Sequence, residues 1–83
     1  MIQAIGDKID VYAKFSKGSL IPQGFTWKQK DYPLKKLNFS FRKQEGLTVL
    51  LYYSALGETA AYELEFNLKT FIWRLTKAYL PGS

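Results

Sequence analysis

Large apolar residues recur at every second position along Thr48–Leu80, TVLLYYSALGETAAYELEFNLKTFIWRLTKAYL. A period of two is typical of β-strands that bury one face. Breaks near Gly57 and Lys69 divide the stretch, so three strands joined by two hairpins are predicted. One face of these strands collects Val49, Leu51, Tyr53, Tyr62, Leu64, Phe66, Phe71, Trp73 and Leu75.

Two tight turns would bring all of these residues into one register. A two-residue turn at Gly57–Glu58, with glycine first as a type II′ turn prefers, pairs Tyr53 with Tyr62. A second two-residue turn, at Leu68–Lys69, continues the same apolar face into the third strand. Because a slip of one residue would send the aromatic residues to the other face, the two turns support one antiparallel meander.

Further strands precede this meander. Residues 9–15 alternate as a first strand, and Phe25 and Trp27 alternate in a second. Apolar residues before and after the segment Pro22–Gly24 have opposite parity, and both proline and glycine suit an interruption of a strand ladder. A bulge is therefore predicted in this segment.

The segment Lys28–Leu37 contains four lysines and a predicted turn. A turn centred on Gln29–Lys30 pairs Trp27 with Tyr32 and Phe25 with Leu34. The apolar residues that follow, Leu37, Phe39 and Phe41, have the opposite parity to Tyr32 and Leu34, so a bulge or bend is predicted at Lys35–Lys36.

These patterns predict an all-β fold, a small antiparallel up-and-down barrel or strongly bent meander of about six strands. Residues 1–80 form a single domain, and residues 81–83 are predicted to be a disordered tail. Aromatic residues make up 17% of the 83-residue chain and must supply most of the core of so small a domain.

The composition argues against an enzyme. The chain contains neither cysteine nor histidine, which removes thiolate nucleophiles, imidazole bases and nitrogen or sulfur metal ligands. Glu63 and Glu65 share one strand face, a spacing that could hold a metal or an acid–base pair, but Arg74 across the predicted hairpin explains Glu63 as a surface ion pair. No catalytic residue, metal or cofactor is predicted.

The positive charge is concentrated in the N-terminal half. Residues 14–43 contain eight basic residues and a single acid, Asp31, giving a net charge of +7, whereas the remaining residues sum to −2. A basic surface of this kind attracts polyanions, although it can equally be a solvated face that keeps the domain soluble. The residues predicted to contact DNA or RNA are Lys28, Lys30, Lys35, Lys36, Arg42 and Lys43.

The outer face of the C-terminal meander is only partly polar. Leu50, Tyr52 and Ile72 lie there among charged residues. Something is expected to cover them, either another segment of the chain, a second copy in a homodimer, or a different protein partner. These three residues form the predicted protein interface.

No targeting segment or membrane span is predicted. The N-terminal sequence MIQAIGDKIDVY has no basic region followed by an apolar stretch, and no run approaches the ~18 apolar residues of a transmembrane helix. A cytoplasmic protein without membrane partners is therefore expected.

Several short motifs in this order resemble a bacterial family of small domains of unknown function. They are IGDKIDV at Ile5–Val11, FTWKQKDYPL at Phe25–Leu34, YELEF from Tyr62 and WRLTKAYL at Trp73–Leu80. Members of that family also occur fused to the C-terminus of some Y-family DNA-polymerase-like proteins of mutagenic repair. The chain departs from the family pattern in carrying Gln29 where the hairpin has a central glycine, and Leu80-Pro81 in place of an acidic residue.

The resemblance implies an accessory domain working near DNA and brings no catalytic residues. Together with the basic N-terminal half, it favours a non-enzymatic domain that binds nucleic acid non-specifically. The alternative is a protein-interaction or self-association module that uses the apolar outer sheet face.

Overall fold

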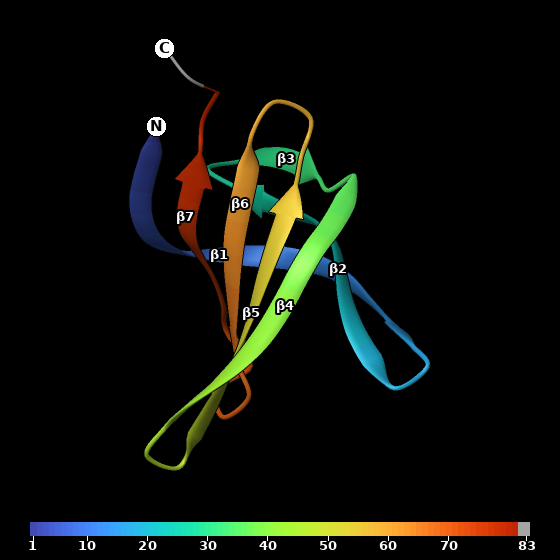
Figure 1. Cartoon of the computed structure of the whole chain (residues 1–83), viewed down its shortest axis with the longest axis vertical. Helices are drawn as coiled ribbons and strands as arrows, with labels where there is room; N and C mark the ends of the chain where they lie inside the picture. Colours follow the sequence, from blue (N-terminus) through green and yellow to red (C-terminus); the bar gives the residue numbers. More distant parts are fainter. Residues whose placement is uncertain (82–83) are drawn as a thin grey trace.

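The structure, a computed structural model, describes residues 1–81, which form seven strands and no helix. The strands are β1 (Ile2–Ser16), β2 (Ser19–Trp27), β3 (Lys30–Pro33), β4 (Lys36–Glu45), β5 (Thr48–Leu56), β6 (Ala61–Asn67) and β7 (Trp73–Tyr79). They build one antiparallel sheet in the order β3-β2-β1-β7-β6-β5-β4 (Figure 1). The predicted all-β, up-and-down architecture is confirmed.

The third predicted strand is divided into β3 and β4 because it changes its neighbour. Leu34 donates its backbone N–H to Gln23 of β2 at 2.9 Å, whereas Lys35 donates to Leu56 of β5 at 2.7 Å. The bend predicted at Lys35–Lys36 therefore exists. It brings the two ends of the sheet together, because β3 and β4 are consecutive segments of the chain.

Strand β1 also serves two neighbours. Its first part pairs with β7, from Ile2 opposite Tyr79, and its second part pairs with β2. The ladder with β7 shifts between Ala4 and Asp7, where Gly6 adopts a φ of 87° that glycine tolerates without strain. The two ends of the described chain consequently lie side by side (Figure 1).

Aromatic and aliphatic side chains from both halves of the chain form one core. Phe25, Leu64 and Leu75 are fully buried, and Trp27 and Tyr32 pack against the same cluster, as predicted. The Phe25 and Tyr32 rings stack with centroids 5.0 Å apart. The small size of the domain makes each of these contacts a large share of its stability.

The hairpins keep the predicted faces but use different loops. In the β5–β6 pair Tyr53 lies opposite Leu64 rather than Tyr62, because Gly57–Ala60 forms the loop. A displacement of two residues preserves the alternation of strand faces, so the apolar residues still point inward.

The β2–β3 turn lies one residue earlier in the chain than predicted. Lys28 and Gln29 are its central residues, with φ values of 52° and 65°, and Phe25 pairs with Tyr32. Positive φ at both positions is the signature of a type I′ hairpin, which normally carries asparagine and glycine. The bulge predicted within Pro22–Gly24 is present, because Gln23 has no partner in the ladder with β1.

The β6–β7 connection also differs from the predicted two-residue turn. Phe66 pairs with Trp73, so Leu68–Phe71 forms the loop, and the side chain of Asn67 accepts backbone N–H groups from two loop residues. Arg74 then lies opposite Glu65 rather than Glu63. The predicted ion pair between Glu63 and Arg74 is therefore wrong.

Candidate nucleic-acid interface

A bulge in β4 turns two phenylalanines outward. Leu37 lies opposite the buried Ala55, but the ladder shifts at Asn38 and Phe39 lies opposite Ser54. Residues on directly opposite positions share a sheet face. Phe39 therefore points away from the core and is 58% exposed. The sequence alternation predicts that Phe39 and Phe41 share a face with Leu37. This prediction is wrong, because the bulge reverses the face after Leu37.

The outward side of β4 carries four residues that we call the outer stripe. Lys36, Phe39, Phe41 and Lys43 lie opposite alternate residues of β5 and so share one face. All four are exposed. A lysine thus stands at each end of a pair of exposed aromatic rings.

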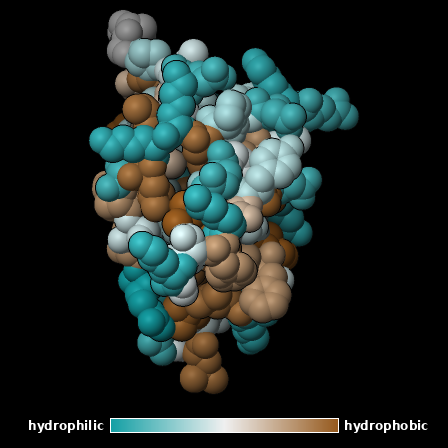
Figure 2. All heavy atoms as spheres, turned by 90° about the vertical axis from the view of Figure 1, so that its right-hand side faces the viewer, coloured by the Kyte–Doolittle hydropathy of each residue, from teal (hydrophilic) through white to brown (hydrophobic). Residues whose placement is uncertain are grey.

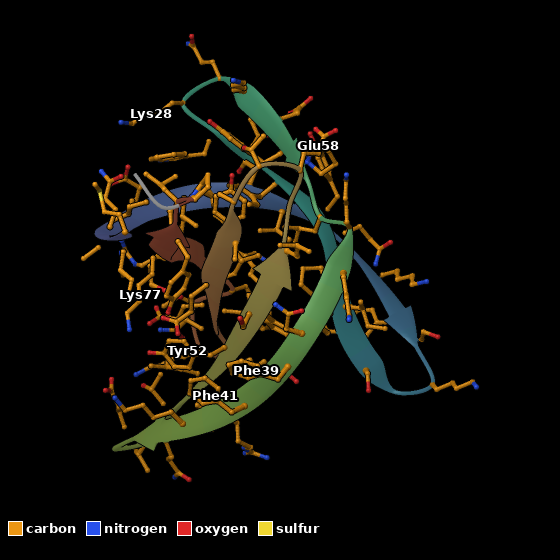
Figure 3. The ribbon with its side chains drawn as sticks, turned by 45° about the horizontal axis from the view of Figure 1, so that its top comes forward. Lys28, Phe39, Phe41, Tyr52, Glu58 and Lys77 are labelled. Carbon is orange, nitrogen blue, oxygen red and sulfur yellow. The ribbon has the colours of Figure 1, made fainter. Side chains whose placement is uncertain are left out.

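Three rings of this face form a stack that we call the aromatic stack. Phe41 lies 4.9 Å from Tyr52 of β5 with an interplanar angle of 11°, and Phe39 lies 6.3 Å from Phe41 at 23°. The three rings follow one another across β4 and β5 (Figure 3). Phe39 ends the stack with more than half of its surface in solvent, so another planar ring could continue it.

A hydrogen bond holds the inner end of the aromatic stack. The Tyr52 hydroxyl donates to Oε2 of Glu65 on β6 at 2.8 Å. Burial, and then the hydrogen bond to this carboxylate, raise the pKa of Tyr52 to about 12. The hydroxyl therefore remains protonated, and remains a donor, at all physiological pH values.

This raised pKa predicts an alkaline loss of stability that Tyr52→Phe should reduce. Since the folded state holds the proton more tightly than the unfolded state, the stabilisation is complete below pH 10 and is lost as the pH rises from about 10 to about 12. With partial solvent screening, the difference should be about 1–2 kcal/mol. Urea unfolding at about pH 9 and about pH 11.5 measures it, and equal pH slopes in the two proteins would contradict the assignment.

Lys28 and Lys30, two of the predicted nucleic-acid contacts, lie at the β2–β3 turn and not on the outer stripe. The ammonium group of Lys28 sits 4.8 Å from the Trp27 ring centroid, and that of Lys30 sits 5.8 Å from the Tyr32 centroid. Figure 3 places Lys28 at the end of the molecule opposite Phe41. The indole N–H of Trp27 donates a hydrogen bond to the Asp7 carboxylate at 2.8 Å, and its ring packs against the core. The Trp27 ring therefore has a structural role.

The other predicted cations follow the β3–β4 segment. Lys35 and Lys36 lie at the corner where the strand changes its neighbour. Lys43 lies on the outer stripe, 3.2 Å from the Glu45 carboxylate, whereas Arg42 lies opposite Leu51 and so on the other side of the strand. The six predicted cations therefore do not share one sheet face.

Acidic residues border the aromatic stack on one side. Glu63 and Glu65 lie on β6, where Glu63 accepts a hydrogen bond from Thr76 at 2.7 Å and Glu65 accepts the Tyr52 hydroxyl. Arg74 lies opposite Glu65 and donates to the carbonyl of Gly6. A polyanion on this face would be repelled from β6 and favoured along β4.

Asp31, the single acid of residues 14–43, forms hydrogen bonds with neighbouring strands. Asp31 accepts hydrogen bonds from Thr26 at 2.7 Å and from the Tyr12 hydroxyl at 3.0 Å. This network joins β1, β2 and β3 on their outward side. These hydrogen bonds give Asp31, the one acid among the eight basic residues of this half, a structural role that does not involve a ligand.

The predicted protein interface is largely covered by the chain itself. Leu50 is 6% exposed, and Tyr52 and Ile72 are half-buried. Leu50 therefore offers almost no contact area to a partner. The exposed apolar side chains of the same β4–β5 face are instead Phe39, Phe41 and Leu56, which lies opposite Lys36.

Within residues 1–81, the structure contains no group of three or more carboxylates placed to hold a metal ion. The same residues include no helix of the length and apolar character needed to cross a bilayer.

No family model, curated protein or solved structure gives a significant match to the chain. The resemblance to the repair-associated bacterial family remains a prediction. The geometry of the surface must therefore carry any functional proposal.

Proposed function

We propose that the domain binds single-stranded nucleic acid, without strong sequence preference, along the outer stripe of β4. One observation carries the proposal, namely the exposed aromatic stack placed between Lys36 and Lys43 on one strand face. Stacking on aromatic rings tolerates any base, and flanking cations neutralise phosphates. Burial of an aromatic ring is its commonest structural use, but Phe39 and Phe41 are not buried and so need another explanation.

The arrangement also favours single strands over duplexes. Bases must be unstacked from their neighbours before they can lie against protein rings, and a single strand permits this at least cost. Lys36 and Lys43 are seven positions apart along β4, which corresponds to roughly 20 Å of strand. This length suits a short contact along a flexible polyanion.

Fluorescence anisotropy with mixed-sequence oligonucleotides of about 12 nucleotides tests the proposal. We expect Phe41→Ala to weaken single-strand binding by about 5- to 100-fold, which corresponds to the loss of one stacked base. We expect Lys36→Glu with Lys43→Glu to lower the affinity and to flatten its salt dependence between about 50 mM and about 200 mM.

The charge-matched control is Lys28→Glu with Lys30→Glu. Lys28 lies at the other end of the molecule from the aromatic stack (Figure 3), and Lys30 belongs to the same turn, opposite Trp27. This double variant changes the net charge equally and should retain most of the affinity. Absence of single-strand binding at low salt would refute the proposal, as would equal losses in the two double variants.

The context implied by the resemblance, an accessory function near DNA in a bacterial cytoplasm, belongs to the same proposal. It is supported by the motifs quoted above and by the excess of positive charge in residues 14–43.

A second candidate function uses the same two phenylalanines as a protein contact. Exposed apolar rings that adjoin each other are typical of interaction surfaces, including homodimer contacts. Sedimentation velocity at increasing concentration distinguishes the two functions, because self-association through this face would be abolished by Phe41→Ala and would depend little on salt.

A further inference from the structure

The inner face of the sheet is uncovered at the lower end of the molecule in Figure 1. An open groove of about 470 Å³ lies there between the β1–β2, β4–β5 and β6–β7 hairpins. Its lining includes Phe15, Leu20, Leu51, Phe66, Phe71 and Trp73. Figure 2 shows apolar side chains gathered over the lower half of the molecule, whereas more of the upper half is hydrophilic.

The groove exists because the sheet lacks a strand at this end. After Leu34 the chain leaves β2 and pairs with β5, so Ser19–Pro22 of β2 has β1 as its one neighbour. Likewise, Phe39–Glu45 of β4 pairs with β5 alone. Two strand edges with unpaired backbone groups thus flank the groove, and such edges readily accept another strand.

The residues on the floor of the groove belong to the core face. Leu51 lies opposite Phe66, and Phe66 opposite Trp73, so the three form a row across β5, β6 and β7. The Phe66 and Trp73 rings are 4.5 Å apart. These residues continue the buried layer, yet each is only half-buried because no strand covers them.

Two further aromatic residues stand in solvent at the rim. Phe15 is 79% exposed and Phe71 is 71% exposed. Phe71 also has a φ of 60°, a conformation that is strained for an aromatic residue, and its ring lies parallel to Phe66 at 5.9 Å. Large exposed aromatic residues of this kind are disfavoured unless they contact a partner.

The charges around the groove select the partner. Lys17 lies in the β1–β2 turn, Arg42 lies on the inner face of β4 opposite Leu51, and Lys69 lies in the β6–β7 loop. Lys14, next to Phe15 on β1, points to the outer face. The carboxylate at the tip of β4, Glu45, is paired with Lys43. A basic rim around an apolar floor is complementary to an acidic, amphipathic ligand.

We propose that the groove binds an extended segment of a partner protein, which adds as a β-strand to the free edge of β4. Backbone hydrogen bonds would give affinity, and apolar side chains at alternate positions would cover the groove. The acidic residues between them would point to the outer face of the sheet, where Lys14 of β1 and Lys43 of β4 lie. A second copy of the chain is disfavoured, because its equally basic rim would be placed against this one.

The probe is a fluorescein-labelled peptide of about nine residues in which valine and leucine alternate with glutamate and threonine. Saturable binding is expected, with protection of the backbone amides of β4 from hydrogen exchange. Phe15→Asp, an exposed position that should not disturb folding, is expected to weaken binding by about tenfold or more. A peptide of the same composition with its apolar residues grouped together should bind at least about tenfold more weakly.

The control is Ile2→Asp, which introduces an aspartate at another exposed apolar position, opposite Tyr79 at the end of β7 away from the groove. It should leave peptide binding unchanged, while Phe15→Asp should leave oligonucleotide binding unchanged. Equal binding of the alternating and grouped peptides would overturn the proposal, and so would no detectable binding. A dimer abolished by Phe15→Asp, or binding to phosphatidylserine vesicles without peptide binding, would assign the groove to another occupant and also overturn it.

Discussion

Phe25→Ala should lower the free energy of unfolding by about 3–5 kcal/mol, the largest loss expected from a single substitution in this domain. The Phe25 side chain has no exposed surface, and its ring stacks on Tyr32 and meets the edge of Tyr62 at 5.1 Å. Truncation would leave a cavity between strands of both halves of the sheet. Small domains have only about 5–10 kcal/mol of stability, so much of it would be lost.

Urea unfolding monitored by tryptophan fluorescence measures this loss, and Phe15→Ala is its control. Phe15 undergoes the same chemical change but is 79% exposed, so its truncation should change stability by less than about 0.5 kcal/mol. A loss below about 1 kcal/mol for Phe25→Ala would show that this ring does not anchor the core.

Gly57→Ala should destabilise the domain by about 1–3 kcal/mol through overpacking. A Cβ atom at this position would lie 2.8 Å from Cε2 of Tyr62 and 3.2 Å from the carbonyl oxygen of Ala60. Tyr62 is 5% exposed and packs against Phe25 and Tyr32, so its ring has little room to move. The backbone of Gly57 also donates to Ala60, which fixes the loop.

Thermal unfolding of Gly57→Ala and of Glu58→Ala separates this close contact from a general sensitivity of the loop. Glu58 is exposed, so its substitution should leave the melting temperature almost unchanged. If the two variants melted at the same temperature, the close approach of Gly57 to Tyr62 would have no energetic consequence.

The strand faces of the C-terminal half could be predicted from sequence because their period is two. Loops that are two residues longer than predicted move Tyr53 from Tyr62 to Leu64 but leave both partners on the inner face. The exact register could not be predicted, because it depends on loop conformations that carry weak sequence signals. The turn at Lys28–Gln29 illustrates this, since neither residue type normally adopts positive φ.

The outward rotation of Phe39 and Phe41 could not be read from the sequence. Their alternation with Leu37 is what a regular strand would show, and one bulge residue, Asn38, reverses it. The excess of lysines was visible from sequence. The sequence did not show that these lysines lie at two ends and on two faces of the sheet, because strand direction and bulges determine where each one lies.

The first and last strands of the chain are neighbours, and this has a kinetic consequence. Ile2 lies opposite Tyr79, and the backbone N–H of Leu80 donates to the carbonyl of Met1 at 2.9 Å. Nearly the whole chain lies between the residues that make these contacts, which raises the mean sequence separation of contacting residues. Folding is therefore expected on the slow side for a domain of this size, in milliseconds to seconds. A circular permutant that joins the two ends and opens the chain at the β4–β5 turn would make this pairing local.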